Sequence, residues 1–226
     1  AATTGLRILM EGGNAVDAAI AAAAALNVVE PMSTGVGGDM FALVWDNKER
    51  SVRALNGSGS APAASNIEEL TEKGLRAMPD TGVYSVATPG TVHGWETLLD
   101  SCGTMPLSKL LGPAIDYAEN GFPVSDIISF QWQRELGKLA AFPAATELMP
   151  NGKAPSQGDF VKLPTLAATL RAIAEGGSEA FYNGPIAEKT AAFVQEHGGW
   201  LSVERALSRS PPISCGTCTQ IRTMPP

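Results

Sequence analysis

Apolar residues recur at helical spacing over most of the chain. A short first helix is expected to end at Gly12-Gly13, with Thr3 or Thr4 as its N-cap. Its apolar face would consist of Leu6, Leu9 and Met10. A second helix is expected to begin after Asn14, a good N-cap residue, and its many alanines favour close packing on several sides.

The helical pattern is interrupted near residue 40. Residues 40–45 are continuously apolar without alternation, which is typical of a strand covered on both faces. A polar turn at residues 46–49 and a partner strand at residues 51–55 complete a hairpin. Helices followed by buried strands and more helices predict an α+β fold with a sheet between helical layers.

The remainder is predicted to be mainly helical. Five further helices are expected. Four have start signals at Asn66, Ser125, Pro164 and Pro185, and the fifth carries Trp95, Leu98 and Leu99 on one face. Residues 142–158 are rich in Pro, Gly and Ala and predict a loop. We expect one partial domain over residues 1–226. Within it, residues 1–65 form helices plus a hairpin, residues 66–204 are mainly helical, and residues 205–226 form a poorly patterned tail.

The composition excludes some classes of protein. The 226 residues are 44% hydrophobic and 17% charged, as in ordinary globular proteins. A net charge of −7 argues against a nucleic-acid partner, because phosphates need a basic patch. The longest apolar run, residues 18–29, is shorter than the ~20 residues that a membrane span needs, so a buried helix is expected there.

Candidate chemistry is sparse. Gly35-x-Gly37-Gly38 resembles a phosphate-binding loop, but a helix precedes it and a strand follows, which is the reverse of the required order. These glycines are instead expected to allow close approach of another segment or a substrate. The two histidines, His93 and His197, fit helix ends better than a serine triad.

The three cysteines do not form a disulfide framework. Cys215 and Cys218 have the spacing of a zinc or redox pair, but no second pair accompanies them, and we interpret the spacing as chance. No metal site and no cofactor are predicted.

A series of phrases resembles the gamma-glutamyltransferase family in order and spacing. They are residues 11–19, 29–31, 35–38, 60–62, 88–92, 103–107, 113–115, 120–122, 181–184, 186–187, 198–201, 212–214 and 224–226. The resemblance covers nearly the whole chain and corresponds to the large-subunit portion of the family, in its acylase-like branch.

The resemblance implies an N-terminal nucleophile hydrolase fold, an αββα sandwich that is incomplete here. Members are made as precursors that cleave themselves into a large and a small subunit. A threonine at the start of the small subunit attacks a gamma-glutamyl or other acyl amide, with its own amino group as base. The expected partners are therefore the small-subunit segment of the same precursor and a small amide substrate.

That threonine belongs to a motif beyond the Met-Pro-Pro phrase, here Met224-Pro225-Pro226. We therefore expect no catalytic residue in this chain and no activity of the chain alone. The alternative is a truncated, non-catalytic fragment. No signal peptide is visible, which leaves open a cytoplasmic, periplasmic or secreted location.

Two departures from the family pattern bear on the substrate. Ser58 stands where typical members carry an arginine that binds the substrate's alpha-carboxylate, and a hydroxyl cannot replace a bidentate guanidinium. Asp39 interrupts what is a run of four glycines in typical members. Both resemble branch members that are acylases for glutaryl or other side-chain amides, and Ser58 is the predicted substrate-binding residue.

Overall fold

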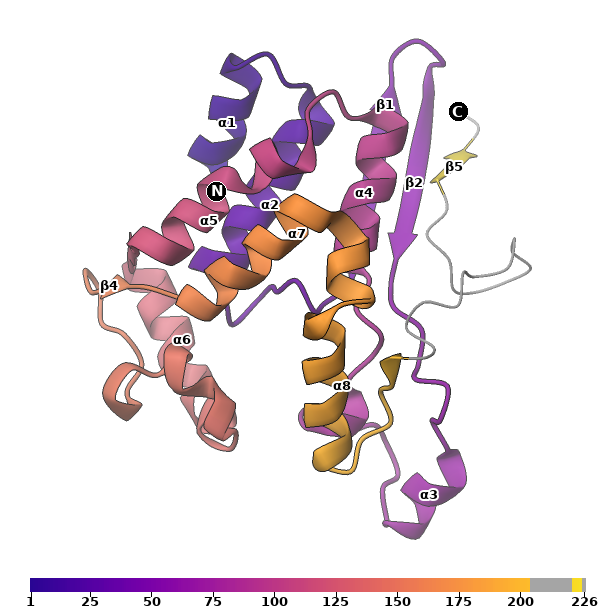
Figure 1. Cartoon of the computed structure of the whole chain (residues 1–226), viewed down its shortest axis with the longest axis vertical. Helices are drawn as coiled ribbons and strands as arrows, with labels where there is room; N and C mark the ends of the chain where they lie inside the picture. The colour runs from indigo at the N-terminus through magenta and orange to yellow at the C-terminus, as the bar shows by residue number, and fades with distance from the viewer. Residues whose placement is uncertain (204–220, 225–226) are drawn as a thin grey trace. The chain divides into compact units, whose positions relative to one another are not determined.

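The structure is a computed structural model that describes residues 1–203 and 221–224 (Figure 1). The chain divides into two compact units. The first comprises Ala1–Val36 and Leu98–Gly177, and the second comprises Gly37–Thr97 and Ser178–Pro226. None of the helices in the described residues is long and apolar enough to cross a membrane.

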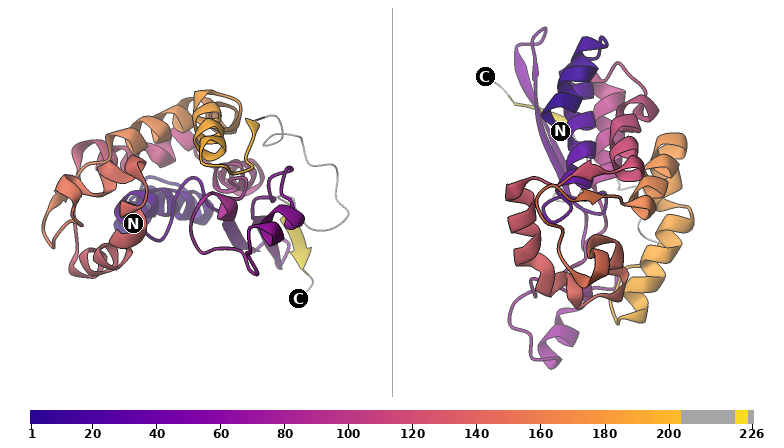
Figure 2. Two further views of the ribbon diagram at one scale, coloured as in Figure 1. Left: turned by 90° about the horizontal axis from the view of Figure 1, so that it is seen from below. Right: turned by 90° about the vertical axis from the view of Figure 1, so that its left-hand side faces the viewer.

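The first unit is built around helix α2 (Ala15–Val29). This helix packs against α1 (Ala2–Met10) and α5 (Leu107–Asn120), and the three lie side by side (Figures 1 and 2). Its predicted start is confirmed. The Asn14 side chain accepts hydrogen bonds from the Val16 and Asp17 N–H groups, and Asp17 accepts one from Asn14 N–H in return, which completes a capping box.

The prediction for α1 is wrong in its buried face. Leu6, Leu9 and Met10 are exposed, whereas Thr4, Gly5 and Ile8 are buried. The reason is close approach between helices, because a Cβ on Gly5 would lie 3.3 Å from the Ala18 carbonyl oxygen of α2. Neither Thr3 nor Thr4 caps the helix, whose N-cap is Ala1 without a side-chain bond.

The rest of the first unit contains helix α6 (Asp126–Ala140), the two-stranded β3–β4 sheet (Phe122–Pro123 with Phe160–Val161) and most of α7 (Pro164–Tyr182). Ser125 caps α6 as predicted, through the Ile128 N–H. The expected loop contains two short 3-10 helices, Pro143–Leu148 and Pro150–Gly152. Helix α7 is interrupted at Gly177, whose positive φ of 61° explains the glycine there.

The second unit contains an antiparallel sheet in the order β1-β2-β5. The predicted hairpin is confirmed as β1 (Met40–Asp46) and β2 (Ser51–Gly57), paired from Met40 opposite Gly57 to Asp46 opposite Ser51. Strand β5 (Ile221–Met224) pairs with β2 and was not predicted, because residues 205–226 show no strand period.

The prediction that residues 40–45 are covered on both faces is wrong for this chain. Every second side chain of β1 is exposed: Phe41 by 67%, Leu43 by 74% and Trp45 by 53%. The Arg50 guanidinium lies 5.4 Å from the centre of the Trp45 ring. The apolar residues on this face form a surface that we call the β1 apolar face, and it consists of Phe41, Leu43 and Trp45.

Four helical segments complete the second unit: α3 (Ile67–Glu72), the 3-10 turn η1 (Val83–Ser85), most of α4 (Thr91–Cys102) and α8 (Pro185–Glu196). Asn66 caps α3 and Pro185 begins α8, both as predicted. The N-terminus of α4 lies next to the start of β1, because the Thr91 hydroxyl is 2.8 Å from the Gly38 carbonyl oxygen.

Candidate functional site

Three short segments of the second unit meet where β1 begins, β2 ends and α4 begins. We call this place the three-segment junction, and it consists of residues 38–39, 56–60 and 88–91. The Gly90 and Thr91 N–H groups donate to the Gly38 carbonyl oxygen at 2.9 and 3.0 Å. The Thr88 N–H donates to the Ser60 carbonyl oxygen at 3.0 Å. Backbone hydrogen bonds therefore join all three segments.

Glycines allow this close approach of backbones. A Cβ on Gly59 would lie only 1.4 Å from the Thr88 carbonyl oxygen, and one on Gly90 only 1.9 Å from the Gly57 carbonyl oxygen. Real Cβ atoms do not come so near to backbone, so both positions require glycine. The sequence suggested close packing at residues 35–38, but the structure shows it chiefly at Gly59 and Gly90.

The predicted binding residue, Ser58, lies in this junction and is half-buried. Asn56 Oδ1 accepts the Ser58 backbone N–H at 2.9 Å and the Ser58 hydroxyl at 2.7 Å, which forms an Asx turn. The hydroxyl proton is therefore committed within the loop, while the oxygen lone pairs can still accept. The role of Ser58 in substrate binding stays a prediction.

Asp39 lies beside Ser58. Its Oδ1 accepts a hydrogen bond from the Gly59 N–H at 3.1 Å, and this side chain is exposed. In the sequence Asp39 was visible only as a departure from a glycine run. Its contact with a loop 20 residues further along could not be deduced from local pattern.

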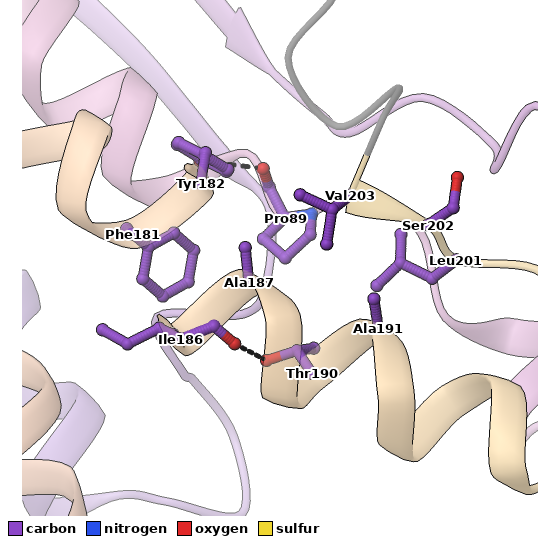
Figure 3. Close-up of a pocket in the computed structure, with 10 residues that line it drawn as sticks. All are labelled: Pro89, Phe181, Tyr182, Ile186, Ala187, Thr190, Ala191, Leu201, Ser202 and Val203. Carbon is purple, nitrogen blue, oxygen red and sulfur yellow. Dashed lines mark hydrogen bonds between the residues drawn. The ribbon is translucent and has the colours of Figure 1, made fainter. Parts of the chain in front are cut away.

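Tyr182, at the end of α7, is hydrogen-bonded to the segment of the junction that contains Pro89. Its hydroxyl donates to the Pro89 carbonyl oxygen at 2.9 Å (Figure 3). The same hydroxyl accepts the His93 backbone N–H at 3.3 Å. The second bond satisfies a donor in the first turn of α4, which has no partner within the helix. Burial raises the pKa of Tyr182 to about 12, so the phenol is neutral and able to donate at ordinary pH.

Sequence reasoning did not single out Tyr182 as a functional residue. It noted the phrase Phe181-Tyr182-x-Gly184 only as part of a resemblance. The pair lines a small apolar pocket shown in Figure 3, together with Pro89, Ile186, Ala187, Thr190, Ala191, Leu201, Ser202 and Val203. The Thr190 hydroxyl donates a hydrogen bond to the Ile186 carbonyl oxygen at 2.8 Å.

The sequence also offered His197 and a cysteine pair as candidates. His197 Nδ1 lies 2.8 Å from the Phe193 carbonyl oxygen, in keeping with its predicted place at a helix end. Within residues 1–203 and 221–224, no group of three or more His, Cys, Asp or Glu side chains could hold a metal ion. Cys215 and Cys218 lie outside the described residues.

Comparison with known proteins identifies the family. The model of the gamma-glutamyltranspeptidase family matches residues 1–205. The chain is 38% identical to the glutathione hydrolase-like YwrD proenzyme of Bacillus subtilis, over 90% of this chain and 39% of that protein. It is also 38% identical to the oxamate amidohydrolase proenzyme of Klebsiella pneumoniae, over 84% of this chain and 37% of that protein.

Solved structures of similar fold are consistent with this family match. Helicobacter pylori gamma-glutamyltranspeptidase superposes with a TM-score of 0.87 at 29% identity, covering 99% of this chain and 67% of that one. The cephalosporin acylase of Bacillus halodurans superposes with a TM-score of 0.85 at 40% identity, covering 90% of this chain and 39% of that one.

These matches confirm the expected fold class, an incomplete N-terminal nucleophile hydrolase fold of mixed α+β type. The chain spans about two fifths of the length of the curated relatives it matches, in their N-terminal, large-subunit portion. It belongs to the gamma-glutamyltranspeptidase family.

Proposed function

We propose that this member of the gamma-glutamyltranspeptidase family is the large-subunit part of a threonine-dependent amide hydrolase or acyltransferase. The observation that carries the proposal is the family match over residues 1–205. Several of the matching phrases converge in the three-segment junction, which supports a shared architecture of the substrate site. Relatives with this match are named as proenzymes, which supports synthesis as a precursor.

The nucleophile of this reaction comes from the small-subunit segment. The only Thr-Thr pair in the sequence, Thr3-Thr4, is embedded in helix α1. Thr4 is 2% exposed, and its Oγ1 lies 3.4 Å from the Tyr117 hydroxyl in the same unit. A side chain buried in this way serves packing and has no access to a substrate. Thr3 is exposed, but Ala1 and Ala2 precede it, so it has no free α-amino group to act as base. We therefore expect the chain alone to be inactive.

The β1 apolar face supports the existence of a covering partner. Three large apolar side chains exposed in alternation on one strand are unusual for a surface that stays in water. Strand β1 is also the outer strand of the described sheet, so one of its edges carries unpaired backbone groups. We assign the small-subunit segment of the same precursor to this face and edge.

The substrate is a small gamma-glutamyl or other acyl amide. The relatives are named as a glutathione hydrolase-like proenzyme, an oxamate amidohydrolase and a cephalosporin acylase, and such enzymes differ in the acyl group that they accept. Ser58 lines the acyl pocket in this proposal. A hydroxyl gives a weaker hold on a substrate carboxylate than a guanidinium would, because it carries no charge.

The test is amide hydrolysis by the full-length gene product that contains these 226 residues. Gamma-glutamyl, glutaryl and pentanoyl p-nitroanilides are the probes, and released p-nitroaniline is measured by absorbance. We expect turnover of at least one probe by the full-length product and none by residues 1–226 alone. Inertness of the full-length product towards all three, or turnover by residues 1–226, contradicts the proposal. Inertness would favour the alternative, a non-catalytic fragment.

The role of Ser58 has its own test. Replacing Ser58→Arg should raise kcat/KM for the glutaryl probe relative to the pentanoyl probe by about 10-fold, the usual value of one charge-assisted hydrogen bond. Ser65→Arg is the matched control, because Ser65 is exposed in the same unit and outside the junction. An unchanged glutaryl-to-pentanoyl ratio would remove Ser58 from the acyl pocket.

A further inference from the structure

Residues 61–87 form an excursion of the second unit whose two ends meet. The chain runs from the end of β2 through α3 and η1 and returns to the start of α4 (Figure 1). The Thr88 N–H donates to the Ser60 carbonyl oxygen at 3.0 Å, so the residues that flank the excursion are hydrogen-bonded to each other. Both flanking residues belong to the three-segment junction. We call residues 61–87 the lobe.

The lobe has no apolar core of its own. Every residue from 61 to 87 is exposed or half-buried, and helix α3 buries no side chain. In the adjoining strand β2, by contrast, Leu55 is only 3% exposed. Segments with little buried apolar surface open at a lower free energy than the core of the same protein. The closed position of the lobe therefore depends on a small number of contacts.

One group of these contacts lies away from the ends of the lobe. The Trp200 indole N–H donates to Glu69 Oε2 at 2.9 Å. The Trp200 and Tyr84 rings lie 4.8 Å apart, centre to centre. Lys73 Nζ is 3.3 Å from Glu69 Oε1 and 5.3 Å from the centre of the Tyr84 ring. We call this group the Trp200 contact, and it consists of Glu69, Lys73, Tyr84 and Trp200.

The residue before Trp200 also packs against the lobe. A Cβ on Gly199 would lie 2.8 Å from the Val83 Cβ, which is closer than real Cβ atoms approach. Glycine at this position thus lets the lobe come close to the chain that follows α8. The lobe is accordingly held at two places, at its ends in the junction and at residues 199–200.

We propose that the lobe opens and closes as a unit, that the Trp200 contact holds it closed, and that its opening loosens the three-segment junction. Ser60 and Thr88 transmit the motion, because they flank the lobe and are also part of the junction. The packing there is tight, since a Cβ on Gly59 would overlap the Thr88 carbonyl oxygen. A displacement of Thr88 therefore also displaces residues 56–60. This conformational change goes beyond the proposed function and does not depend on it.

The size of the effect can be set from the hydrogen bond of Trp200. A bond to a charged acceptor is stronger than a neutral one, but the Glu69 side chain is 37% exposed, so solvent weakens it. Loss of this bond should raise the population of the open lobe about 3- to 10-fold. Trp200→Phe removes the N–H and keeps an aromatic ring beside Tyr84.

Hydrogen–deuterium exchange of backbone amides measures this population, because an amide exchanges when its segment opens. The experiment uses the full-length gene product and mass spectrometry of three peptides. Residues 67–75 report on the lobe, residues 86–91 on the junction, and residues 51–55 on strand β2. The β2 peptide shows whether a variant has destabilised the whole unit.

Trp200→Phe should speed exchange of the lobe and of the Thr88 amide about 3- to 10-fold and leave β2 at the wild-type rate. Glu69→Ala removes the acceptor and should have the same effect. Glu68→Ala is the matched control, because Glu68 is exposed in the same first turn of α3, and it should leave all three peptides unchanged. The double variant should exchange no faster than the faster single variant, since both changes remove one bond.

Three results would overturn the inference. Unchanged exchange of the lobe in Trp200→Phe would mean that the Trp200 contact does not hold it closed. Equal acceleration of the lobe and β2 would mean that the lobe does not open separately. Acceleration of the lobe without the Thr88 amide would remove the link to the junction. None of these results depends on turnover, so a full-length product inert towards all amides would overturn the proposed function and leave this inference intact.

Discussion

Asp17 provides the sharpest prediction about stability. Its carboxylate is fully buried in the first unit, with 0% exposure, and is held entirely by hydrogen bonds. One oxygen accepts the Thr104 and Met105 N–H groups at 2.9 and 3.2 Å, and the other accepts the Asn14 N–H at 2.8 Å and the Thr104 hydroxyl. The side chain thus joins the start of α2 to the turn that precedes α5.

Replacing Asp17→Asn should lower the free energy of unfolding by about 2 to 4 kcal/mol. The amide keeps one accepting oxygen, but its NH2 group faces two donors that lose their partner, and each unsatisfied buried donor costs about 1–3 kcal/mol. The avoided cost of burying a charge offsets part of this loss. Urea unfolding of the purified chain, followed by far-UV circular dichroism, measures the difference.

Asp100→Asn is the matched control, because Asp100 is exposed and belongs to the same unit. Surface changes of this kind usually stay within about 0.5 kcal/mol. If Asp17→Asn falls within that same margin, the hydrogen bonds at Asp17 do not hold the helices together and the reasoning is refuted.

The pH dependence of the same pair provides an independent check. Burial alone would raise the pKa of Asp17, but the hydrogen bonds from Thr104, Asn14 and Met105 outweigh it, so the pKa lies below its ordinary value. A lowered pKa gives stability above the unfolded-state value, which is lost as pH falls through the folded-state value. The wild type should therefore lose its advantage over Asp17→Asn only below about pH 4. A constant difference down to pH 2 would contradict this.

Three further changes test the second unit. Tyr182→Phe leaves the Pro89 carbonyl without its donor and should lower the free energy of unfolding in urea by about 1 to 3 kcal/mol. It should also reduce turnover by the full-length product. Unaltered stability would show that the hydrogen bond does not stabilise the unit. Gly59→Ala should destabilise the junction by more than 1 kcal/mol, because its Cβ would overlap the Thr88 carbonyl oxygen, and wild-type melting of that variant would contradict the geometry. Leu43→Lys should leave the free energy of unfolding of the isolated chain within about 0.5 kcal/mol of the wild-type value. It should reduce assembly with the small-subunit segment, measured by co-purification. Intact assembly would exclude the β1 apolar face from that interface.

The elements that sequence predicts well are those whose signals are local. Asn14, Asn66 and Ser125 each cap the helix that follows, because a side-chain oxygen reaches N–H groups only two or three residues away. The β1–β2 hairpin was likewise predictable, since its turn and both strands are contiguous in the chain.

Two of the failures involve contacts between distant segments. The buried face of α1 is decided by Gly5, whose lack of a side chain lets α2 approach, and this outweighs the larger apolar residues beside it. Strand β5 is fixed by pairing with β2, more than 160 residues earlier, as in Leu55 opposite Ile221. Neither partner carries a local signal for the pairing.

The candidate site also combines local features, which the sequence can predict, with long-range contacts, which it cannot. Ser58 was found from a resemblance, and its Asx turn with Asn56 is a local feature. The hydrogen bond between Asp39 and Gly59, and that between Tyr182 and Pro89, join positions 20 and 93 residues apart. Single-sequence pattern cannot reveal such pairs, so the charge beside Ser58 became visible only in the structure.

The family phrases in the described residues serve architecture rather than reaction chemistry. The phrase around Asn14 and Asp17 satisfies buried backbone donors in the first unit. The phrases around Gly38 and Gly90 bring three backbones into contact that no side chain would allow. A scaffold of this kind fixes the position of a substrate pocket without supplying a nucleophile. In the proposed function, acyl specificity arises from the few side chains that this scaffold presents, and Ser58 is the first position to exchange.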